Sequence, residues 1–158
     1  MKTFAKLVLA TLVLCLSSFT SGAQSADAGV IDKFIAKQAN RENGSEPDGV
    51  RKVVTGDLDH DGVPDTAVLY TIEGQDGTNN YVQYLAVFLS RRGRLVYAAH
   101  IPLGGKNRRE IELTSIKDNL MFFETTSYAK RDPSCCPTLK GTTRYALVGN
   151  KLTEMRRK

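Results

Sequence analysis

The sequence lacks the motifs of the common enzyme classes. Its two histidines, His60 and His100, lie in no HExxH zinc-binding pattern. It has no GxSxG nucleophile elbow, no phosphate-binding loop of the Walker type and no dinucleotide-binding fingerprint that leads into a helix. The glycine pair Gly104–Gly105, which precedes polar residues, is typical of a hairpin turn. These absences leave the chain without a candidate catalytic residue and favour a protein that is not an enzyme.

The sequence also lacks long apolar segments and repeats. The longest apolar stretch, Leu7–Leu16, is ten residues long, whereas a membrane-spanning helix needs about 20. No segment is repeated along the chain, so the several blades of a β-propeller are missing. We therefore expect no permanent membrane span and no repeat architecture.

The N-terminal residues have the order of a secretory signal peptide. Lys2 and Lys6 precede the apolar stretch, and small and polar residues follow it as far as Ala23. Cleavage after Ala23 would leave residues 24–158 as a single β-rich domain, periplasmic or secreted. Lipidation at Cys15 is the alternative, but Leu14 stands where a small residue is expected before an acylated cysteine.

The charge is mildly positive and dispersed. The whole chain has 22 basic and 17 acidic residues, and residues 1–23 contribute two lysines and no acid. The basic residues lie in short groups, such as 91–94 and 106–109, which solvated turns explain. A nucleic-acid-binding surface gathers Lys and Arg on one face, so we expect no nucleic-acid partner.

The mature chain begins with one amphipathic helix, at about residues 30–43. Its apolar residues recur at helical spacing; they are Val30, Ile31, Phe34, Ile35 and Ala39. Because these residues share one face, we expect the helix to pack on the rest of the domain.

Segments rich in β-branched and aromatic residues follow, separated by short turns. These predicted strands span about residues 50–155; they are 50–56, 65–73, 81–90, 95–101, 109–116, 120–128, 142–148 and 152–155. Short turns join antiparallel neighbours, and no connection is long enough for the crossover that parallel strands need. The sequence therefore predicts an α+β fold, with the N-terminal helix packed on an antiparallel β-meander.

The clearest chemical motif is the stretch Asp57–Asp65, which reads DLDHDGVPD. Calcium takes about six to eight oxygen ligands, which a loop supplies from alternate positions around a glycine bend. The predicted ligands are Asp57, Asp59, Asp61, the carbonyl group of Val63, and Asp65, with Gly62 at the bend. Without a cation these carboxylates repel one another. The motif predicts a structural calcium site, with His60 pointing to solvent; a polar turn without metal is the alternative.

The same stretch resembles the DxDxDGxxD calcium loop of FG-GAP repeats and is similar to the loops of dockerins and thrombospondin type 3 repeats. Gly56 before it and the strand at 66–70 after it match the FG-GAP setting. Those families carry several copies and this chain has one, so the resemblance implies calcium ligation without the propeller fold. Val68 stands at the twelfth position, where an EF-hand has an acidic residue.

Two of the three cysteines, Cys135 and Cys136, are adjacent. Exported proteins meet an oxidising environment, yet adjacent Cα atoms lie about 3.8 Å apart, closer than the roughly 4.4–6.8 Å of most disulfides. One interpretation is a vicinal disulfide that clips a turn between Pro133 and Pro137. The others are a redox or soft-metal role, for example with Cu(I), reduced buried thiols, or an intermolecular bridge.

The element Tyr128–Pro137 contains the sequence Asp-Pro-Ser-Cys-Cys-Pro. Together with the aspartate loop and the closing segment 144–152, it resembles an uncharacterised bacterial family of exported proteins and lipoproteins. The resemblance covers about residues 50–154 and implies a secreted β-rich domain without an activity.

Three functions agree with these features. The first, which the sequence favours, is a calcium-stabilised binding module of the cell envelope whose ligand is a protein, a peptide or a glycan. The second is a periplasmic inhibitor or immunity protein against a secreted hydrolase. The third is a redox protein or enzyme that uses Cys135 and Cys136 or a pair of carboxylates.

Overall fold

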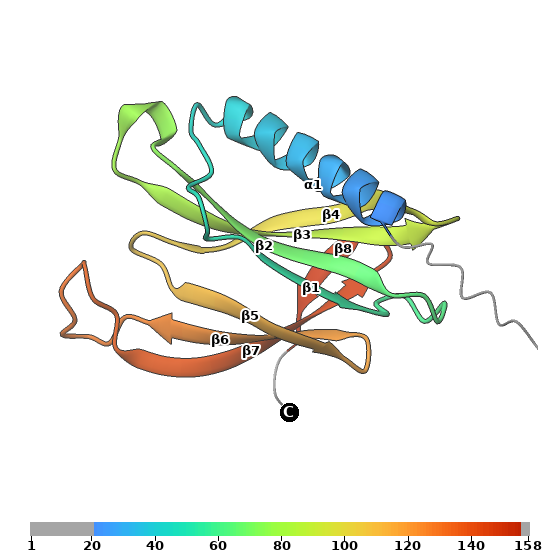
Figure 1. The fold of residues 1–158 in the computed structure, drawn as a ribbon. Helices are drawn as coiled ribbons and strands as arrows, with labels where there is room; N and C mark the ends of the chain where they lie inside the picture. Colours follow the sequence, from blue (N-terminus) through green and yellow to red (C-terminus); the bar gives the residue numbers. More distant parts are fainter. Residues whose placement is uncertain (1–20, 156–158) are drawn as a thin grey trace, which may run out of the picture.

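The computed structural model describes residues 21–155 (Figure 1). The predicted signal peptide therefore lies outside the described residues except for its last three, and Cys15 lies outside them as well. The elements, in chain order, are α1 (Ser21–Arg41), β1 (Lys52–Gly56), β2 (Asp65–Glu73), the short 3₁₀ helix η1 (Gln75–Gly77), β3 (Tyr81–Arg91), β4 (Arg94–Gly105), β5 (Glu110–Lys117), β6 (Leu120–Ser127), β7 (Leu139–Val148) and β8 (Lys151–Glu154).

The strands form two sheets of four. Sheet A has the order β1-β2-β3-β4 and sheet B the order β5-β6-β7-β8, and every neighbouring pair is antiparallel. Figure 1 shows α1 lying across the face of sheet A that points away from sheet B, so the molecule has three layers. The prediction of a mainly antiparallel β-protein with one helix packed on it is confirmed.

The predicted meander is divided into two sheets between β4 and β5. Strand β4 ends at Gly105, which has a φ of 136°. Glycine adopts this conformation readily, whereas it is strained for other residues. A Cβ atom there would lie 2.5 Å from the backbone oxygen of Tyr81. The turn that follows therefore carries the chain away from β3 and into the second layer.

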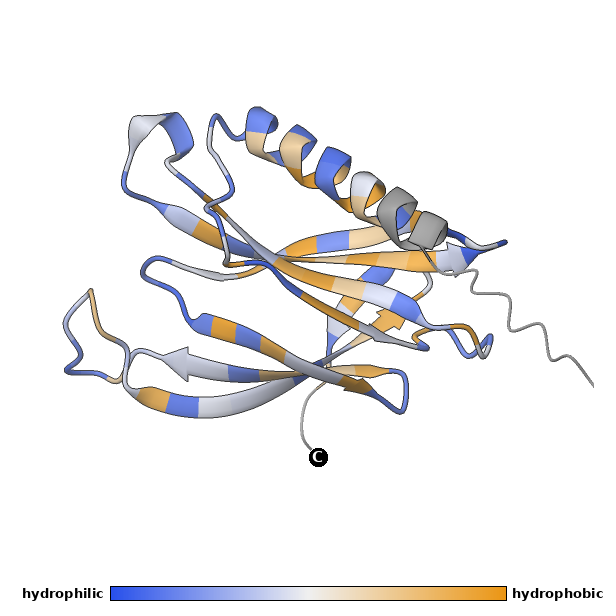
Figure 2. Ribbon diagram, viewed as in Figure 1, coloured by the Kyte–Doolittle hydropathy of each residue, from blue (hydrophilic) through white to orange (hydrophobic). Residues whose placement is uncertain are grey.

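The central strands of sheet A, β2 and β3, are buried on both faces, whereas sheet B is buried on one. Along β2, Ala67 and Leu69 point into the core between the sheets, and Val68 and Tyr70 point into the core beneath α1. Strand β2 therefore reads as an almost continuous apolar run, as expected for a strand covered on both sides. In β5 hydrophobic and charged residues alternate, which Figure 2 shows as orange and blue bands, because only one face of sheet B is covered.

Two boundaries differ from the predicted ones by more than three residues. Helix α1 begins at Ser21, nine residues before the predicted start, because residues 21–29 are small and polar and show no apolar periodicity. Strand β4 continues past Ile101 to Gly105 and contains Pro102. A proline is tolerated there because β4 is at the edge of sheet A and its ladder with β3 is irregular between Gln83 and Tyr84, opposite Pro102.

Candidate functional site

The aspartate loop, residues 57–64, connects β1 to β2 at one end of the molecule (Figure 1). It opens and closes at the pair Gly56 and Asp65, the last residues joined in the β1–β2 ladder. Gly62 has a φ of 80°, the left-handed conformation that its predicted place at the bend requires. His60 is exposed, as expected.

Three of the predicted ligands converge. One carboxylate oxygen from each of Asp57, Asp59 and Asp61 lies within 4.8 Å of the other two. The alternating spacing of the motif thus places these groups around one point, as a hard cation requires. For Val63 the structure shows an exposed side chain and a backbone N–H that donates to Asp61 Oδ1 at 2.9 Å; ligation by its carbonyl group stays a prediction.

Asp57 organises the backbone of the loop. Its carboxylate accepts hydrogen bonds from the N–H of His60 at 2.8 Å and of Gly62 at 3.1 Å. Burial acts to raise the pKa of Asp57, but the hydrogen bonds from these and neighbouring N–H groups outweigh it and hold the pKa below its usual value. The loop is therefore built around an ionised carboxylate.

Arg91 is a partner of the loop that the sequence did not reveal. The guanidinium group donates to Asp61 Oδ2 at 2.9 Å and makes a second, short ion pair with Asp59 Oδ2. The hydrogen bond to Asp59 raises the pKa of Arg91. Arg91 lies 30 residues beyond Asp61, within the basic group 91–94, whose sequence is typical of a solvated turn.

Asp59 keeps one oxygen without a partner. Its Oδ1 atom is buried and accepts no hydrogen bond from the described residues. A buried carboxylate oxygen without a donor is costly. The donor set therefore fits a cation: three converging carboxylates, one with an unused oxygen.

Asp65, the predicted ninth-position ligand, lies apart from this cluster. Its side chain is fully buried, and it accepts hydrogen bonds from the N–H groups of Leu58 at 2.9 Å and Ser90 at 2.8 Å. Asp65 thus ties the start of the loop to the end of β3. Ligation by Asp65 stays a prediction.

Other contacts attach the loop to both sheets. Leu58 is 2% exposed and packs in the core between the sheets. Asn119, in the β5–β6 turn, donates to the carbonyl oxygen of Asp57 at 3.0 Å, and Ser90 Oγ donates to that of Pro64 at 2.6 Å. The converging carboxylates are consequently held by rigid elements rather than by a free loop.

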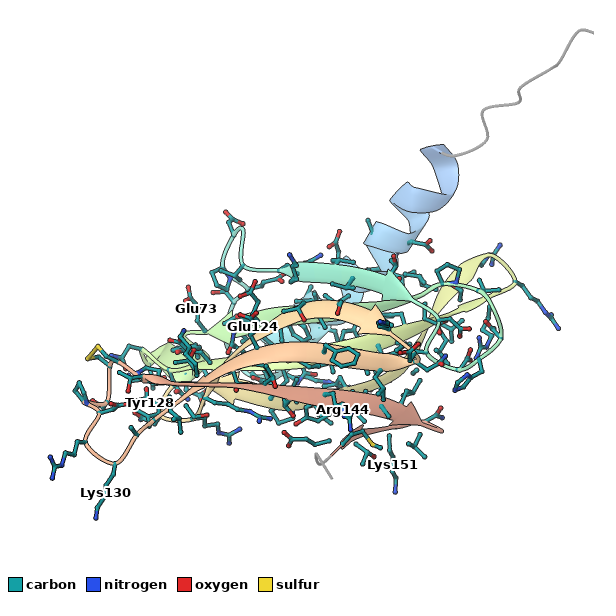
Figure 3. All side chains as sticks on the ribbon, turned by 90° about the horizontal axis from the view of Figure 1, so that it is seen from below. Glu73, Glu124, Tyr128, Lys130, Arg144 and Lys151 are labelled. Atoms are coloured by element: carbon teal, nitrogen blue, oxygen red, sulfur yellow. A yellow bond between two sulfur atoms is a disulfide. The ribbon has the colours of Figure 1, made fainter. Side chains whose placement is uncertain are left out.

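The two cysteines form a disulfide, Cys135–Cys136, with Cα atoms 3.8 Å apart. Both residues are exposed, so the alternative of reduced buried thiols is wrong. The pair belongs to the disulfide loop, residues 128–138, which connects β6 to β7. Figure 3, where Tyr128 and Lys130 mark this loop, shows it at one end of the molecule, and Figure 1 shows the aspartate loop at the other.

Asp132 shapes the disulfide loop from inside. Its carboxylate accepts hydrogen bonds from the N–H groups of Ala129 at 2.7 Å and Thr138 at 2.8 Å, and from the hydroxyl of Thr138. Tyr128 closes the loop further by donating to the carbonyl oxygen of Ser134 at 2.8 Å. The hydrogen bonds, led by that from Ala129, lower the pKa of Asp132.

A polar cleft of about 880 Å³ lies beside the start of β7, with Lys140 and Gly141 in its wall. Gln83 forms another wall, where its amide both donates to and accepts from the backbone of Ile111 in β5, at 3.1 and 3.0 Å. Glu112 and Glu124, which face each other on β5 and β6, also line the cleft.

His100 is half-buried in a group of aromatic side chains beneath α1. Its Nδ1 atom lies 2.8 Å from the hydroxyl of Tyr97, and its ring packs against Phe34 and Tyr84. Burial lowers the pKa of His100. The same contacts join the helix to the sheet. Glu42, which accepts a hydrogen bond from Tyr84 at 2.8 Å, acts to raise the pKa of His100, but burial outweighs it.

No family model, curated protein or solved structure matches this chain. Neither the resemblance of the aspartate loop to FG-GAP loops nor that of the whole domain to exported bacterial proteins is tested by these comparisons, and both stay predictions.

Within residues 21–155, no helix combines the length and the hydrophobicity that crossing a bilayer requires.

Proposed function

We propose that this protein is an exported, calcium-stabilised binding module. The observation that carries the proposal is the convergence of Asp57, Asp59 and Asp61 within 4.8 Å, with Asp59 Oδ1 buried and unpaired. Asp57, Asp59 and Asp61 would hold the ion, and the carbonyl of Val63 and the carboxylate of Asp65 are further candidate ligands. Calcium would supply charge neutralisation and rigidity to the loop.

A binding role is supported by what surrounds the site. Hydrogen bonds fix the loop to the end of β3 and to the β5–β6 turn. A rigid scaffold that presents loops at its ends is a common arrangement for recognition. Periplasmic or secreted location is part of the proposal and rests on the N-terminal sequence pattern.

Calcium titration by isothermal calorimetry, on protein freed of metal with a chelator, tests the proposal. We expect one bound ion per chain and a rise in melting temperature, because a ligand that binds only the folded state stabilises it. Asp59→Asn should abolish both effects. Asp118→Asn is the matched control, since Asp118 lies in the nearby β5–β6 turn outside the converging cluster. Absence of heat and of stabilisation at millimolar calcium would reduce the loop to a polar turn.

A further inference from the structure

A cavity of about 540 Å³ lies beside the aspartate loop. It is bounded by the loop, the end of β3, the β5–β6 turn and the β7–β8 turn. Part of its wall is apolar, from Leu89, Leu120 and Leu147. Small-molecule sites are typically about 300–1,000 Å³, with apolar walls and a few polar groups, so the size and the lining are those of a site for a small ligand.

Arg91 is the polar group best placed to orient such a ligand. It is the only Lys or Arg among the residues that line the cavity. A guanidinium group offers a planar fork of N–H donors that matches a carboxylate. In the present structure both of its amino groups are engaged by Asp59 and Asp61. The guanidinium group that could bind an anion is therefore already paired with two carboxylates.

Without a cation in the aspartate loop, the charges around the cavity disfavour the binding of an anion. Asp59 and Asp118 line the cavity together with Arg91. An entering carboxylate would therefore meet two negative groups and a guanidinium that is already neutralised. If Asp59 and Asp61 were bound to a divalent cation, the ion would neutralise both carboxylates and weaken their ion pairs with the guanidinium. The guanidinium would keep its hydrogen bond to the carbonyl oxygen of Ser90 at 3.0 Å, and Asp59 would no longer repel the ligand.

We propose that this cavity binds a small organic anion, a carboxylate with a short apolar tail, and that calcium in the aspartate loop enables this binding by neutralising Asp59 and Asp61 and so weakening their ion pairs with Arg91. The carboxylate pairs with the guanidinium, and the tail packs on Leu89, Leu120 and Leu147. The inference rests on the calcium site of the proposed function and names the class of ligand for that binding module.

The coupling has a thermodynamic consequence. If calcium raises the affinity for the anion by a given factor, the anion raises the affinity for calcium by the same factor. Couplings between two sites are typically about 5- to 150-fold, and we expect at least about tenfold here because two ion pairs must be exchanged. Each methylene group added to the tail should raise the affinity roughly fourfold while the cavity accommodates it.

Titrations with acetate, butanoate and hexanoate, each with and without calcium, test the proposal. Inorganic phosphate serves as an anion without a tail, and calcium titrated into hexanoate alone provides the reference heat. The Nε–H signal of Arg91 in an NMR spectrum is a second readout, which should shift when calcium is added and again when hexanoate is added.

Arg91→Gln should still bind calcium, with raised affinity because the competing guanidinium is gone, and should lose the coupling to hexanoate. Arg94→Gln is the matched control: it removes the same charge from an exposed residue of the same hairpin that makes no ion pair within residues 21–155, and it should retain the coupling.

The outcomes separate this inference from the function on which it rests. Calcium binding to the wild type with reciprocal coupling to hexanoate, lost in Arg91→Gln, supports it. Calcium binding with no hexanoate binding, equal hexanoate affinity with and without calcium, or affinity independent of tail length would overturn the inference and leave the calcium site standing. Failure of the wild type to bind calcium would overturn both.

Discussion

The two ends of the molecule are closed by different kinds of contact. The aspartate loop is held by groups far away in the sequence: Ser90 and Arg91 at the end of β3, and Asn119 in the β5–β6 turn. The disulfide loop is held by its own residues, through Asp132 and the bond between Cys135 and Cys136. The conformation of the first loop therefore depends on the whole fold, and that of the second depends on the loop itself.

Truncating a leucine at each end should give the largest difference. Leu58→Ala removes a side chain that is 2% exposed in the core between the sheets, and we expect it to lower the free energy of unfolding by about 2–5 kcal/mol. Leu139→Ala, beside the disulfide loop and 58% exposed, should change it by less than about 0.5 kcal/mol. Urea unfolding curves measure both. Equal losses of unfolding free energy in the two variants would show that both ends contribute equally to the stability of the domain.

Replacing the central carboxylate of each end should give the next largest difference. In Asp65→Asn an NH₂ group replaces one carboxylate oxygen, so the N–H group of either Leu58 or Ser90 loses its acceptor. We expect the free energy of unfolding to fall by about 1.5–3 kcal/mol. Asp132→Asn should leave the urea midpoint nearly unchanged, because its hydrogen bonds are confined to an exposed loop. If Asp132→Asn lowered the urea midpoint more than Asp65→Asn does, the disulfide loop would contribute more to the stability of the domain than the aspartate loop.

Removing the disulfide should have a smaller effect on the fold. A cross-link between adjacent residues restricts little of the unfolded chain, and the loop-entropy relation gives roughly 1 kcal/mol for a closed segment of two residues. We expect the double variant Cys135→Ser, Cys136→Ser to show a slightly lower melting temperature, measured by circular dichroism, and unchanged calcium binding. A loss as large as that of Leu58→Ala would mean that the disulfide loop supports the whole domain.

Acid should loosen the disulfide loop without unfolding the domain. The folded-state pKa of Asp132 is lowered from its usual value of 3.8. Its stabilisation is therefore complete above about pH 3.8 and is lost as the pH falls through the lower, folded-state pKa. The amide signals of Ala129 and Thr138 should shift together in that window in an NMR titration. Persistence of the same shifts in Asp132→Asn would show that another group is responsible.

The sequence predicted the strands well, because each is bounded by a turn whose residues can be recognised locally. Strand β2 matches its predicted bounds, 65–73. The division into two sheets was not predictable, since the turn at Gly105 looks like any other hairpin in the sequence. Its effect depends on how closely the backbone of Tyr81 approaches, which is a contact between different strands.

The candidate site was predictable only where its contacts are local. Asp57, Asp59 and Asp61 converge because they alternate within one loop. Asp65 belongs to the same pattern, but its burial depends on Ser90, 25 residues away. Arg91 had no signal at all, because nothing local distinguishes it from Arg92 or Arg94 in the same turn.

Hydrogen exchange followed by mass spectrometry, with and without calcium, tests the central claim most directly. We predict that calcium slows exchange in the aspartate loop, at Ser90 and in the β5–β6 turn, which are hydrogen-bonded to the loop or to Asp65 at its end. Exchange in residues 128–138 should not change. No slowing anywhere, or equal slowing at both ends of the molecule, would contradict the account.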